Sequence, residues 1–380
     1  MPFDFDAPAQ RRGTWSSRWD RYGEDVIPLW VADTDFRAPE PVLEAMAKRV
    51  AHGILGYTVE PPELREAIAA RLQRLYAWRV EPEWIVFLPG VIPGLHLAAR
   101  YLTRPDQHLL LPTPVYQHIT YAAERAPRDH AKVPLVLREG RWVLEVEALA
   151  RHLQPRSRLL MLCNPQNPGG TMYTRGELER QAEFALRHDL LVCSDEIHAD
   201  LLLDTSRPHV PIASLSPEIG RRTVTLMSPN KTFNFPGNGF AYAVIEDAAL
   251  RRAFCTDHHG VLHAPSVTAY AAALAAYSGR CDGWLEAQLD YLRANRNLVE
   301  ETVASIPGLQ MAHTEATYLA WIDASGLGLA DPYAHFLAHG VGLNPGSQFG
   351  AAQHVRLNFG TQRALLGQAL ERIKAARPGG

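Results

Sequence analysis

The chain has 380 residues, of which 47% are hydrophobic and 21% are charged. Because a compact domain has roughly 150 residues, this length indicates two or three domains, and the composition excludes an intrinsically disordered chain. The 38 basic and 41 acidic side chains give a formal net charge of −3, which argues against a nucleic-acid-binding protein, since such proteins usually carry a strong basic excess.

The sequence also lacks the features of membrane-spanning, secreted and disulfide-rich proteins. A membrane-spanning helix needs about 18 or more apolar residues, and the Ala-rich stretch at 269–277 is much shorter. The N-terminus has neither the basic start nor the apolar region of a signal peptide. The four cysteines are far apart and form no C-x-x-C pair, which argues against a disulfide framework or a zinc finger. We therefore expect a soluble, cytoplasmic protein.

Short apolar runs alternate with longer amphipathic segments through the middle of the chain. The runs are apolar throughout, as in strands buried on both faces of a parallel sheet. Strands are predicted at 84–88, 109–111, 159–162, 190–193, 223–227 and 241–245, and helices between them at 93–101, 145–153 and 175–188. This alternation predicts a doubly wound α/β domain over about 45–275.

The pattern changes after Asp282, where the segments predict a smaller α+β domain. A long amphipathic helix is predicted at 284–306 and a final helix at 361–376, with two short apolar strands at 318–322 and 355–359. Turns are predicted at the Pro-Gly pairs of this region. The first 40 residues are expected to pack beside this smaller domain.

Several common catalytic motifs are missing from the sequence. It contains no G-x-x-x-x-G-K-[ST], G-x-G-x-x-G, H-E-x-x-H or G-x-S-x-G pattern. Nucleotide-binding, zinc-protease and serine-hydrolase interpretations therefore lack their usual signatures.

Polar side chains follow three of the predicted strands. Asn167, Asp195 and Lys231 each come after an apolar run, with 28 residues between the first two and 36 between the last two, close to one strand–helix–strand unit each. Taken singly, they have ordinary explanations as a turn, a helix cap and a solvated lysine. Open α/β sheets bind ligands at the carboxyl ends of their strands, so we expect the three side chains to converge on one crevice.

These segments carry a family resemblance that extends from about residue 18 to residue 370. It rests on the motifs Trp30–Phe36, His52–Thr58, Cys163–Pro168, Ser194–Asp200 and Lys231–Asn234. They resemble the fold-type I pyridoxal-phosphate (PLP) enzymes of the aminotransferase class I/II superfamily. More narrowly, they resemble the MalY/PatB branch of cystathionine β-lyases and other cysteine-S-conjugate C–S lyases.

The resemblance implies an α/β fold with two domains. The large PLP-binding domain, over 45–275, would have a mostly parallel seven-stranded sheet. Residues 1–44 and 276–380, from both chain ends, would form the small α+β domain.

The resemblance also implies a role for each residue around the cofactor ring. Lys231 matches the lysine that forms the Schiff base and then takes the substrate's α-proton. Asp195 matches the carboxylate that keeps the ring nitrogen protonated, since a neighbouring negative charge raises the pKa of that nitrogen. The remaining contacts are implied for Asn167 and His198 at the phenolic oxygen, for Ile197 on one ring face and for Tyr116 on the other.

At the phosphate, the implied ligands are a loop at a helix N-terminus and two side chains. The loop is Gly90, Val91 and Ile92, whose free N–H groups favour an anion. Ser228 matches a family phosphate ligand, and Tyr57 matches a tyrosine that reaches the phosphate or substrate of the neighbouring subunit. The resemblance therefore implies a homodimer with shared active sites. Many aminotransferases have an arginine eight positions after the lysine, but Gly239 stands there, as in the MalY-like branch.

The substrate is expected to be a small amino acid. Arg356 matches the arginine that binds its α-carboxylate through a bidentate pair, together with Asn167. No clear second arginine is found for a distal acid, although Arg18, Arg21 and Arg37 stay open. The predicted reaction is β-elimination from S-substituted cysteines, which gives a thiol, pyruvate and ammonia.

Two other functions and one other site are compatible with the sequence. An aminotransferase of the same fold shares the proton abstraction, and a PLP-fold regulatory or binding protein would keep the fold without turnover. The histidine-rich segment Asp257–His263 suggests a metal site, but a loop or cleft lining is the preferred interpretation and no metal is predicted. The chain departs from the branch pattern at Thr34, Gln166, Asn230 and Gln117–Ile119, and Gln117, His118 and Asn230 are expected near the substrate or phosphate.

Overall fold

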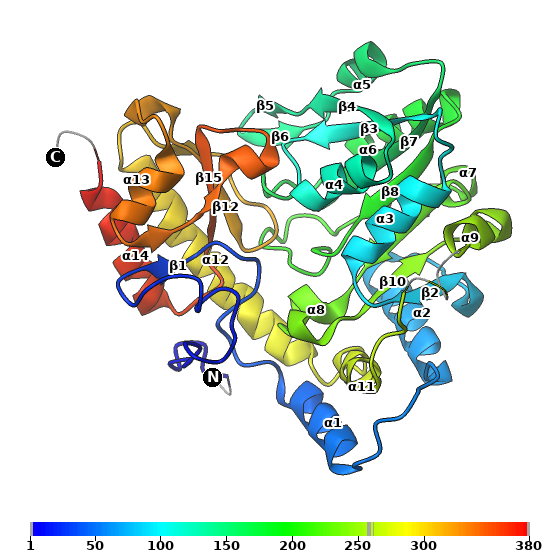
Figure 1. The fold of residues 1–380 in the computed structure, drawn as a ribbon, viewed down its shortest axis with the longest axis horizontal. Coiled ribbons are helices and arrows are strands. Elements are labelled where there is room, and N and C mark those ends of the chain that lie inside the picture. The colour runs from blue at the N-terminus through cyan, green and yellow to red at the C-terminus, as the bar shows by residue number, and fades with distance from the viewer. Residues whose placement is uncertain (1–2, 257–259, 261, 378–380) are drawn as a thin grey trace.

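A large, mostly parallel sheet forms one half of the molecule (Figure 1). The computed structural model describes residues 3–256, 260 and 262–377. Within this described part, seven strands pair in the order β2-β10-β9-β8-β7-β3-β4. Six of them run in the same direction, and β10 runs antiparallel to both of its neighbours, β2 and β9. The strands are β2 (Ile85–Leu88), β3 (His108–Thr113), β4 (Asp129–Pro134), β7 (Ser157–Cys163), β8 (Leu191–Asp195), β9 (Thr223–Met227) and β10 (Ala241–Val244). The predicted fold class is confirmed.

The continuous apolar runs arise because this sheet has a hydrophobic core on each face. Side chains alternate between the two faces of a strand, and in β7 Leu159 and Met161 belong to one core while Leu160 and Leu162 belong to the other. Neighbouring strands divide in the same way. Consecutive positions along the central strands, such as Leu159–Cys163 of β7, are therefore buried, which explains why no polar alternation is visible in the sequence.

Helices cover both faces of the sheet (Figure 1). Side chains of α3, α4 and α9 contribute to one core, and those of α5, α6 and α7 to the other. The helices of this half are α1 (Glu40–Ala51), α2 (Pro62–Tyr76), α3 (Val91–Tyr101), α4 (Gln117–Arg125), α5 (Val146–His152), α6 (Arg175–Arg187), α7 (Pro217–Gly220), α8 (Pro229–Thr232), α9 (Ala248–Phe254) and α11 (Val267–Ala276). A small hairpin joins β5 (Val136–Arg138) to β6 (Arg141–Val143).

A smaller antiparallel sheet and three helices form the other half, where Figure 1 also places both chain ends. Its strand order is β11-β12-β15-β14. The N-terminal segment joins this half through β1 (Ile27–Pro28), which pairs in parallel with β13 (Val341–Gly342). The remaining elements are β11 (Gln310–Met311), β12 (Leu319–Asp323), β14 (Asn344–Pro345), β15 (His354–Asn358), α12 (Asp282–Ala304), α13 (Pro332–Ala338) and α14 (Arg363–Ala375). The domain division stays a prediction, and α1 runs across its first boundary at 44/45.

Element ends differ from the sequence predictions by a few residues, and one difference matters for the site. Helix α3 begins at Val91, two residues before the predicted start at Pro93. A proline is tolerated anywhere in the first turn, because the first four N–H groups of a helix have no partner within it. The N–H groups of Val91 and Ile92 therefore lie in the first turn. No helix in the described ranges is both long and apolar enough to cross a membrane.

Candidate active site

A cavity of about 450 Å³ lies at the carboxyl ends of β7, β8 and β9, between the two halves of the molecule. Every site residue predicted from the sequence lines it, except Tyr57. The residues that it brings together are Gly90, Val91, Ile92, Tyr116, Asn167, Asp195, Ile197, His198, Ser228, Lys231 and Arg356. The strand spacing thus places the amide, the carboxylate and the lysine in one crevice, as the sequence predicts.

Lys231 lies in the short helix α8, directly after β9, and is half-buried in the wall of the cavity. Its Nζ donates a hydrogen bond to the Ala32 carbonyl oxygen. Burial lowers the pKa of Lys231 to about 8, with Arg356 acting in the same direction and Asp33 and Asp195 opposing it. A substantial fraction of the amine is therefore neutral near pH 8, as a nucleophile or general base requires.

Asp195 is the last residue of β8, and its carboxylate is fully enclosed. Burial raises the pKa of Asp195 to about 7, and the neighbouring Glu196 adds to this increase. The Ile197 backbone N–H, which donates to Oδ1 at 3.2 Å, and the charge of Lys231 work against it. A cationic group placed next to this carboxylate would stabilise its charged form.

Arg356 comes from β15 of the small sheet and reaches the same cavity. Its Nη1 donates to Oδ1 of Asn167 at 2.9 Å, and its Nη2 donates to the Trp30 carbonyl oxygen at 3.0 Å. The guanidinium lies 4.8 Å from the ring centre of Phe349, and its buried Nε has no hydrogen-bond partner. Burial lowers the pKa of Arg356 to about 10, so it remains a cation at neutral pH. It is therefore suited to bind a carboxylate.

Tyr116, Ile197 and His198 provide the aromatic, apolar and imidazole walls of the cavity. The Tyr116 N–H donates to the Asn167 carbonyl oxygen at 2.9 Å, which joins the loops after β3 and β7. Burial raises the pKa of Tyr116 to about 12, so its hydroxyl stays protonated. Burial also lowers the pKa of His198 to about 3, with Lys231 adding to the effect, and the buried Nδ1 of this neutral ring has no partner.

The opposite end of the cavity is formed by Gly90 and the first turn of α3, where no side chain caps the helix. Ser228 lies nearby, but its hydroxyl donates to the Phe240 carbonyl oxygen at 2.6 Å and accepts from the Asn230 N–H at 3.0 Å. Backbone N–H groups of α3 are thus the free donors at this end. A Cβ at Gly239 would lie 2.8 Å from the Pro89 carbonyl oxygen, so an arginine at that position would require the backbone to shift.

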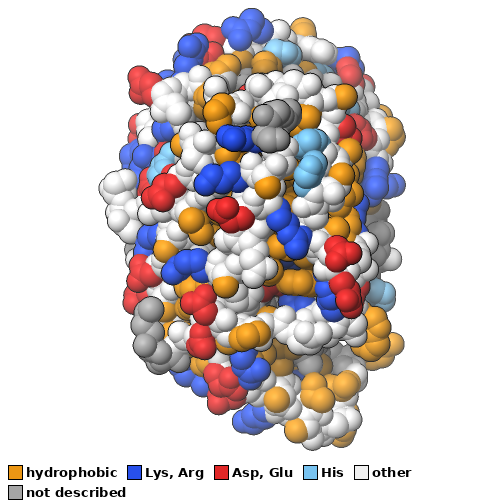
Figure 2. Space-filling model, turned by 90° about the vertical axis from the view of Figure 1, so that its left-hand side faces the viewer, with side chains coloured by type: hydrophobic (Ala, Val, Ile, Leu, Met, Phe, Trp, Pro, Cys, Tyr) orange, Lys and Arg blue, Asp and Glu red, His pale blue; other side chains and the backbone are white. Residues whose placement is uncertain are grey.

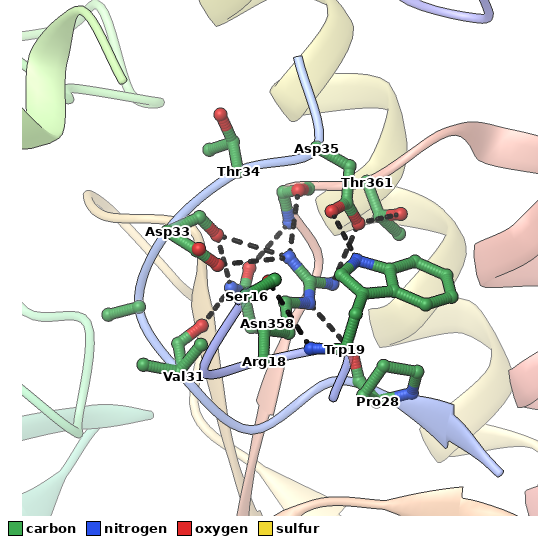
Figure 3. A network of polar contacts seen from close by, with 12 residues as sticks. Ser16, Arg18, Trp19, Pro28, Val31, Asp33, Thr34, Asp35, Asn358 and Thr361 are labelled. Atoms are coloured by element: carbon green, nitrogen blue, oxygen red, sulfur yellow. Dashed lines mark hydrogen bonds and ion pairs between the residues drawn. The ribbon is translucent and has the colours of Figure 1, made fainter. Parts of the chain in front are cut away.

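A network of buried charges fixes the loop whose Ala32 carbonyl accepts from Lys231 (Figure 3). Arg18, with a side chain that is 0% exposed, donates to the Asp33 carbonyl oxygen at 3.2 Å and pairs with the Asp35 carboxylate at 3.2 Å. Asn358 donates to the same Asp33 oxygen at 2.6 Å. Although burial opposes it, Arg18 holds the pKa of Asp35 below its ordinary value. Arg18 therefore anchors the loop and does not face the cavity.

Several lining residues were not predicted from the sequence. Trp30, Asn344 and Gln348 line the cavity, and the buried Oδ1 of Asn344 has no hydrogen-bond partner. Asn344 precedes the Pro345-Gly346 turn, which the sequence pattern marks only as a turn. By contrast, Gln117, His118 and Asn230 line the cavity as expected from their departure from the family pattern.

Two predicted features lie outside this cavity. Tyr57 is fully exposed, between α1 and α2, and its action on a neighbouring subunit stays a prediction. In the histidine-rich segment Asp257–His263, positions 257–259 and 261 lie outside the described residues.

Comparison with known proteins gives a match over nearly the whole chain. The family model described as aminotransferase class I and II matches residues 24–373. The cystathionine beta-lyase PatB of Bacillus subtilis (strain 168) is 37% identical over 98% of this chain and 99% of PatB. Protein MalY of Escherichia coli (strain K12) is 31% identical over 96% of each chain.

Comparison with solved structures also gives matches over nearly the whole chain. The crystal structure of OvoB is 46% identical and superimposes with a TM-score of 0.97 over 100% of both chains. The PLP-bound C-S lyase from Staphylococcus hominis is 29% identical, with a TM-score of 0.92 over 99% of this chain and 98% of that chain. The chain therefore belongs to the aminotransferase class I and II family, in the branch that contains PatB and MalY.

Proposed function

We propose that this chain is a PLP-dependent carbon–sulfur lyase that removes the thiol from S-substituted L-cysteines by β-elimination. The observation that carries the proposal is that Lys231 lines the same cavity as Asp195 and Arg356. The names of its relatives support it, because PatB is a cystathionine beta-lyase and the similar Staphylococcus hominis enzyme is a PLP-bound C-S lyase.

The residues of the cavity fit PLP at each of its functional groups. Lys231 would hold the aldehyde carbon, Asp195 the ring nitrogen and Asn167 the phenolic oxygen, while the first-turn N–H groups of α3 would hold the phosphate. The raised pKa of Asp195, caused by burial, fits a carboxylate that pairs with a cationic ring nitrogen. When bound, the cofactor withdraws electrons from the α-carbon of an attached amino acid.

The chain's own residues would then orient the substrate and move its proton. Arg356 and Asn167 bind the α-carboxylate, which directs the Cα–H bond toward Lys231. The Nζ of Lys231 accepts the proton, the electron pair of that bond forms the Cα–Cβ double bond, and the Cβ–S bond breaks with its electrons on sulfur. The thiolate leaves, and addition of water converts the released 2-aminoacrylate into pyruvate and ammonia.

Incubation of the PLP-loaded protein with L-cystathionine or S-methyl-L-cysteine tests this proposal. Pyruvate and free thiol should form in equal amounts. Transfer of the amino group to 2-oxoglutarate without pyruvate would instead assign the chain as an aminotransferase.

The proposed enzyme is a homodimer that shares its active sites. An exposed apolar segment between α1 and α2 supports this, because Ile54, Leu55, Tyr57 and Val59 are each more than half exposed. Figure 2 shows hydrophobic side chains gathered at the lower end of the molecule, where Figure 1 places the C-terminal end of α1. We also propose a cytoplasmic location, which agrees with four free cysteines.

Mixing two inactive variants tests the shared site. Lys231→Ala and Tyr57→Ala dimers, dissociated and reassociated together, should regain about a quarter of the wild-type activity, because half of the dimers then contain one intact site. A mixture that stays inactive, although size-exclusion chromatography with light scattering detects dimers, would contradict the shared site.

A further inference from the structure

A second cavity, of about 760 Å³, meets the first one at Lys231. The two cavities share Val31, Ala32, Lys231 and Pro236 in their walls. The second cavity is otherwise enclosed by the N-terminal segment 4–17, by residues 33–37 and by the chain after α8. Arg356 and Asn167 line only the first cavity, so the carboxylate end of a substrate belongs there.

From this arrangement we propose that the second cavity binds the S-substituent of the substrate, and that it selects flat, uncharged, aromatic substituents that stack on Trp15. The proposal rests on the proposed lyase function, because it assigns the part of the substrate beyond Cβ. Lys231 must contact the Cα–H bond, and it lies at the junction of the two cavities. A substituent too large for the first cavity therefore has the second cavity next to it.

Four aromatic side chains line the second cavity. Phe5, Phe36 and Phe235 line it and are themselves almost completely buried. Trp15 lines it too, but is 98% exposed. Because Trp15 lines the cavity and is itself exposed, it offers a free ring face on which a second aromatic ring can stack.

Trp15 is held in this exposed position by its own loop. Its φ is 60°, in the left-handed region that bulky residues rarely occupy. The Asp20 carboxylate accepts hydrogen bonds from the Gly13 N–H at 2.8 Å and from the Ser16 N–H at 2.9 Å, on either side of Trp15. The unfavourable conformation is therefore maintained by the surrounding contacts, as is common at ligand-binding positions.

Both arginines that line the second cavity are already paired, which disfavours a substituent with its own carboxylate. Arg11 lies between Asp33, at 2.6 Å, and Asp35, at 2.8 Å. Arg37 pairs with Glu40 at 3.2 Å, at the surface. Arg18 and Arg21, the other two candidates for binding a distal acid, do not line this cavity. Arg18 is part of the buried network (Figure 3), and Arg21 stacks on Trp30.

Kinetics on three holoenzymes test the proposal: the wild type, Trp15→Ala and Trp15→Phe. The substrates are S-phenyl-L-cysteine, which carries a flat uncharged ring, and β-chloro-L-alanine, which has a small leaving group. The kcat/KM for S-phenyl-L-cysteine divided by that for β-chloro-L-alanine should fall by about fivefold in Trp15→Ala, mainly through KM, as expected for the loss of one ring-stacking contact. In Trp15→Phe, which keeps a ring, this ratio should be largely kept. Leu137→Ala, an exposed apolar position that lines neither cavity, should leave the ratio unchanged.

Binding of an unreactive analogue, measured as a dissociation constant from the change in visible absorption of the bound cofactor, provides a second readout that needs no elimination. L-Homophenylalanine has a CH₂ group in place of the sulfur of S-phenyl-L-cysteine and no leaving group. Its dissociation constant should rise by about the same factor in Trp15→Ala, while that of L-alanine serves as the reference.

Three outcomes would overturn the subsite. The first is an unchanged ratio in Trp15→Ala, and the second is an equal loss of kcat/KM for both substrates. The third is a Trp15→Ala protein that dissociates into monomers without a change in the ratio. That result would assign Trp15 to the contact with a second copy of the chain. A wild type that forms no pyruvate from either substrate would overturn the lyase function, while the dissociation constants would still test the subsite.

Discussion

The hydrogen bond of 2.9 Å between Nη1 of Arg356 and Oδ1 of Asn167 joins the small sheet to the loop after β7. Each side chain fixes the other, so the binding position for a carboxylate depends on how the two halves of the molecule pack. Because both residues lie on the same cavity wall, the bond couples substrate binding to the position of the small sheet.

Arg356→Lys should lower kcat/KM by about 100-fold, because lysine keeps the charge but loses the bidentate geometry with the carboxylate. The loss should appear mostly in KM for each S-substituted cysteine. Steady-state kinetics measure it, and an unchanged visible absorption of the bound cofactor provides the control. A loss that is confined to kcat would contradict the assignment to carboxylate binding.

Lys231→Ala should abolish the visible absorption of covalently held PLP and reduce activity by at least about 10⁴-fold, since both attachment and proton transfer depend on Nζ. In the wild type, burial lowers the pKa of Lys231 to about 8, so the neutral amine increases as pH rises through 8. The rate at which PLP attaches to the cofactor-free protein should therefore rise between pH 7 and 9 and then level off. A midpoint near the ordinary lysine value would argue against the buried amine.

Asp195 should make the cofactor-free protein less stable as the pH rises. Burial raises the pKa of Asp195 from 3.8 to about 7 in the folded protein, so the folded state binds more protons than the unfolded state between these values. The contribution to stability is fully present below pH 3.8 and is lost as pH rises through 7. Urea denaturation of the cofactor-free wild type and Asp195→Asn should show this slope only in the wild type, with a difference of a few kcal/mol.

Gly239→Ala should destabilise the protein by about 1–3 kcal/mol, because the new Cβ would lie 2.8 Å from the Pro89 carbonyl oxygen. Gly237→Ala is the matched control, since a Cβ at that position meets no atom within 4 Å. The free energies of unfolding of the two variants, measured in urea, compare a crowded and an open glycine. Equal values would show that the chain relaxes around Gly239 without cost.

Arg18→Met should cost about 3–5 kcal/mol of stability, because it leaves the buried Asp35 carboxylate without its closest buried cation (Figure 3). Arg37→Met, which removes an exposed pair with Glu40, should cost less than about 1 kcal/mol. Thermal unfolding of both variants with PLP bound gives the comparison. If Arg18→Met unfolds at the wild-type temperature, the network does not anchor the loop.

The sequence by itself determined the large sheet and the convergence of Asn167, Asp195 and Lys231. Apolar runs identify strands buried on both faces, and one strand–helix–strand unit between each pair of polar residues places them at the same sheet edge. These are local patterns. The geometry of a strand–helix–strand unit then places the three polar residues at the sheet edge, so their spacing predicts this placement without knowledge of any long-range contact.

Only the tertiary structure decided which distant groups complete the site. Arg356 meets Asn167 across 189 positions of sequence, and Lys231 contacts the Ala32 carbonyl across 199. The first of these was anticipated only through the family resemblance, and the second has no signal in the sequence. Such contacts depend on how the small sheet and the N-terminal segment pack against the large sheet.

What the length and the near-neutral charge contribute to the site likewise depends on the folded molecule. The second cavity exists because segments 4–17 and 231–237 pack together beside Lys231, and its charges are paired only in that arrangement. Burial, and not residue type, lowers the pKa of Lys231 and raises the pKa of Asp195. The sequence supplies the chemical groups, and the packing of distant segments sets their reactivity because it removes them from water.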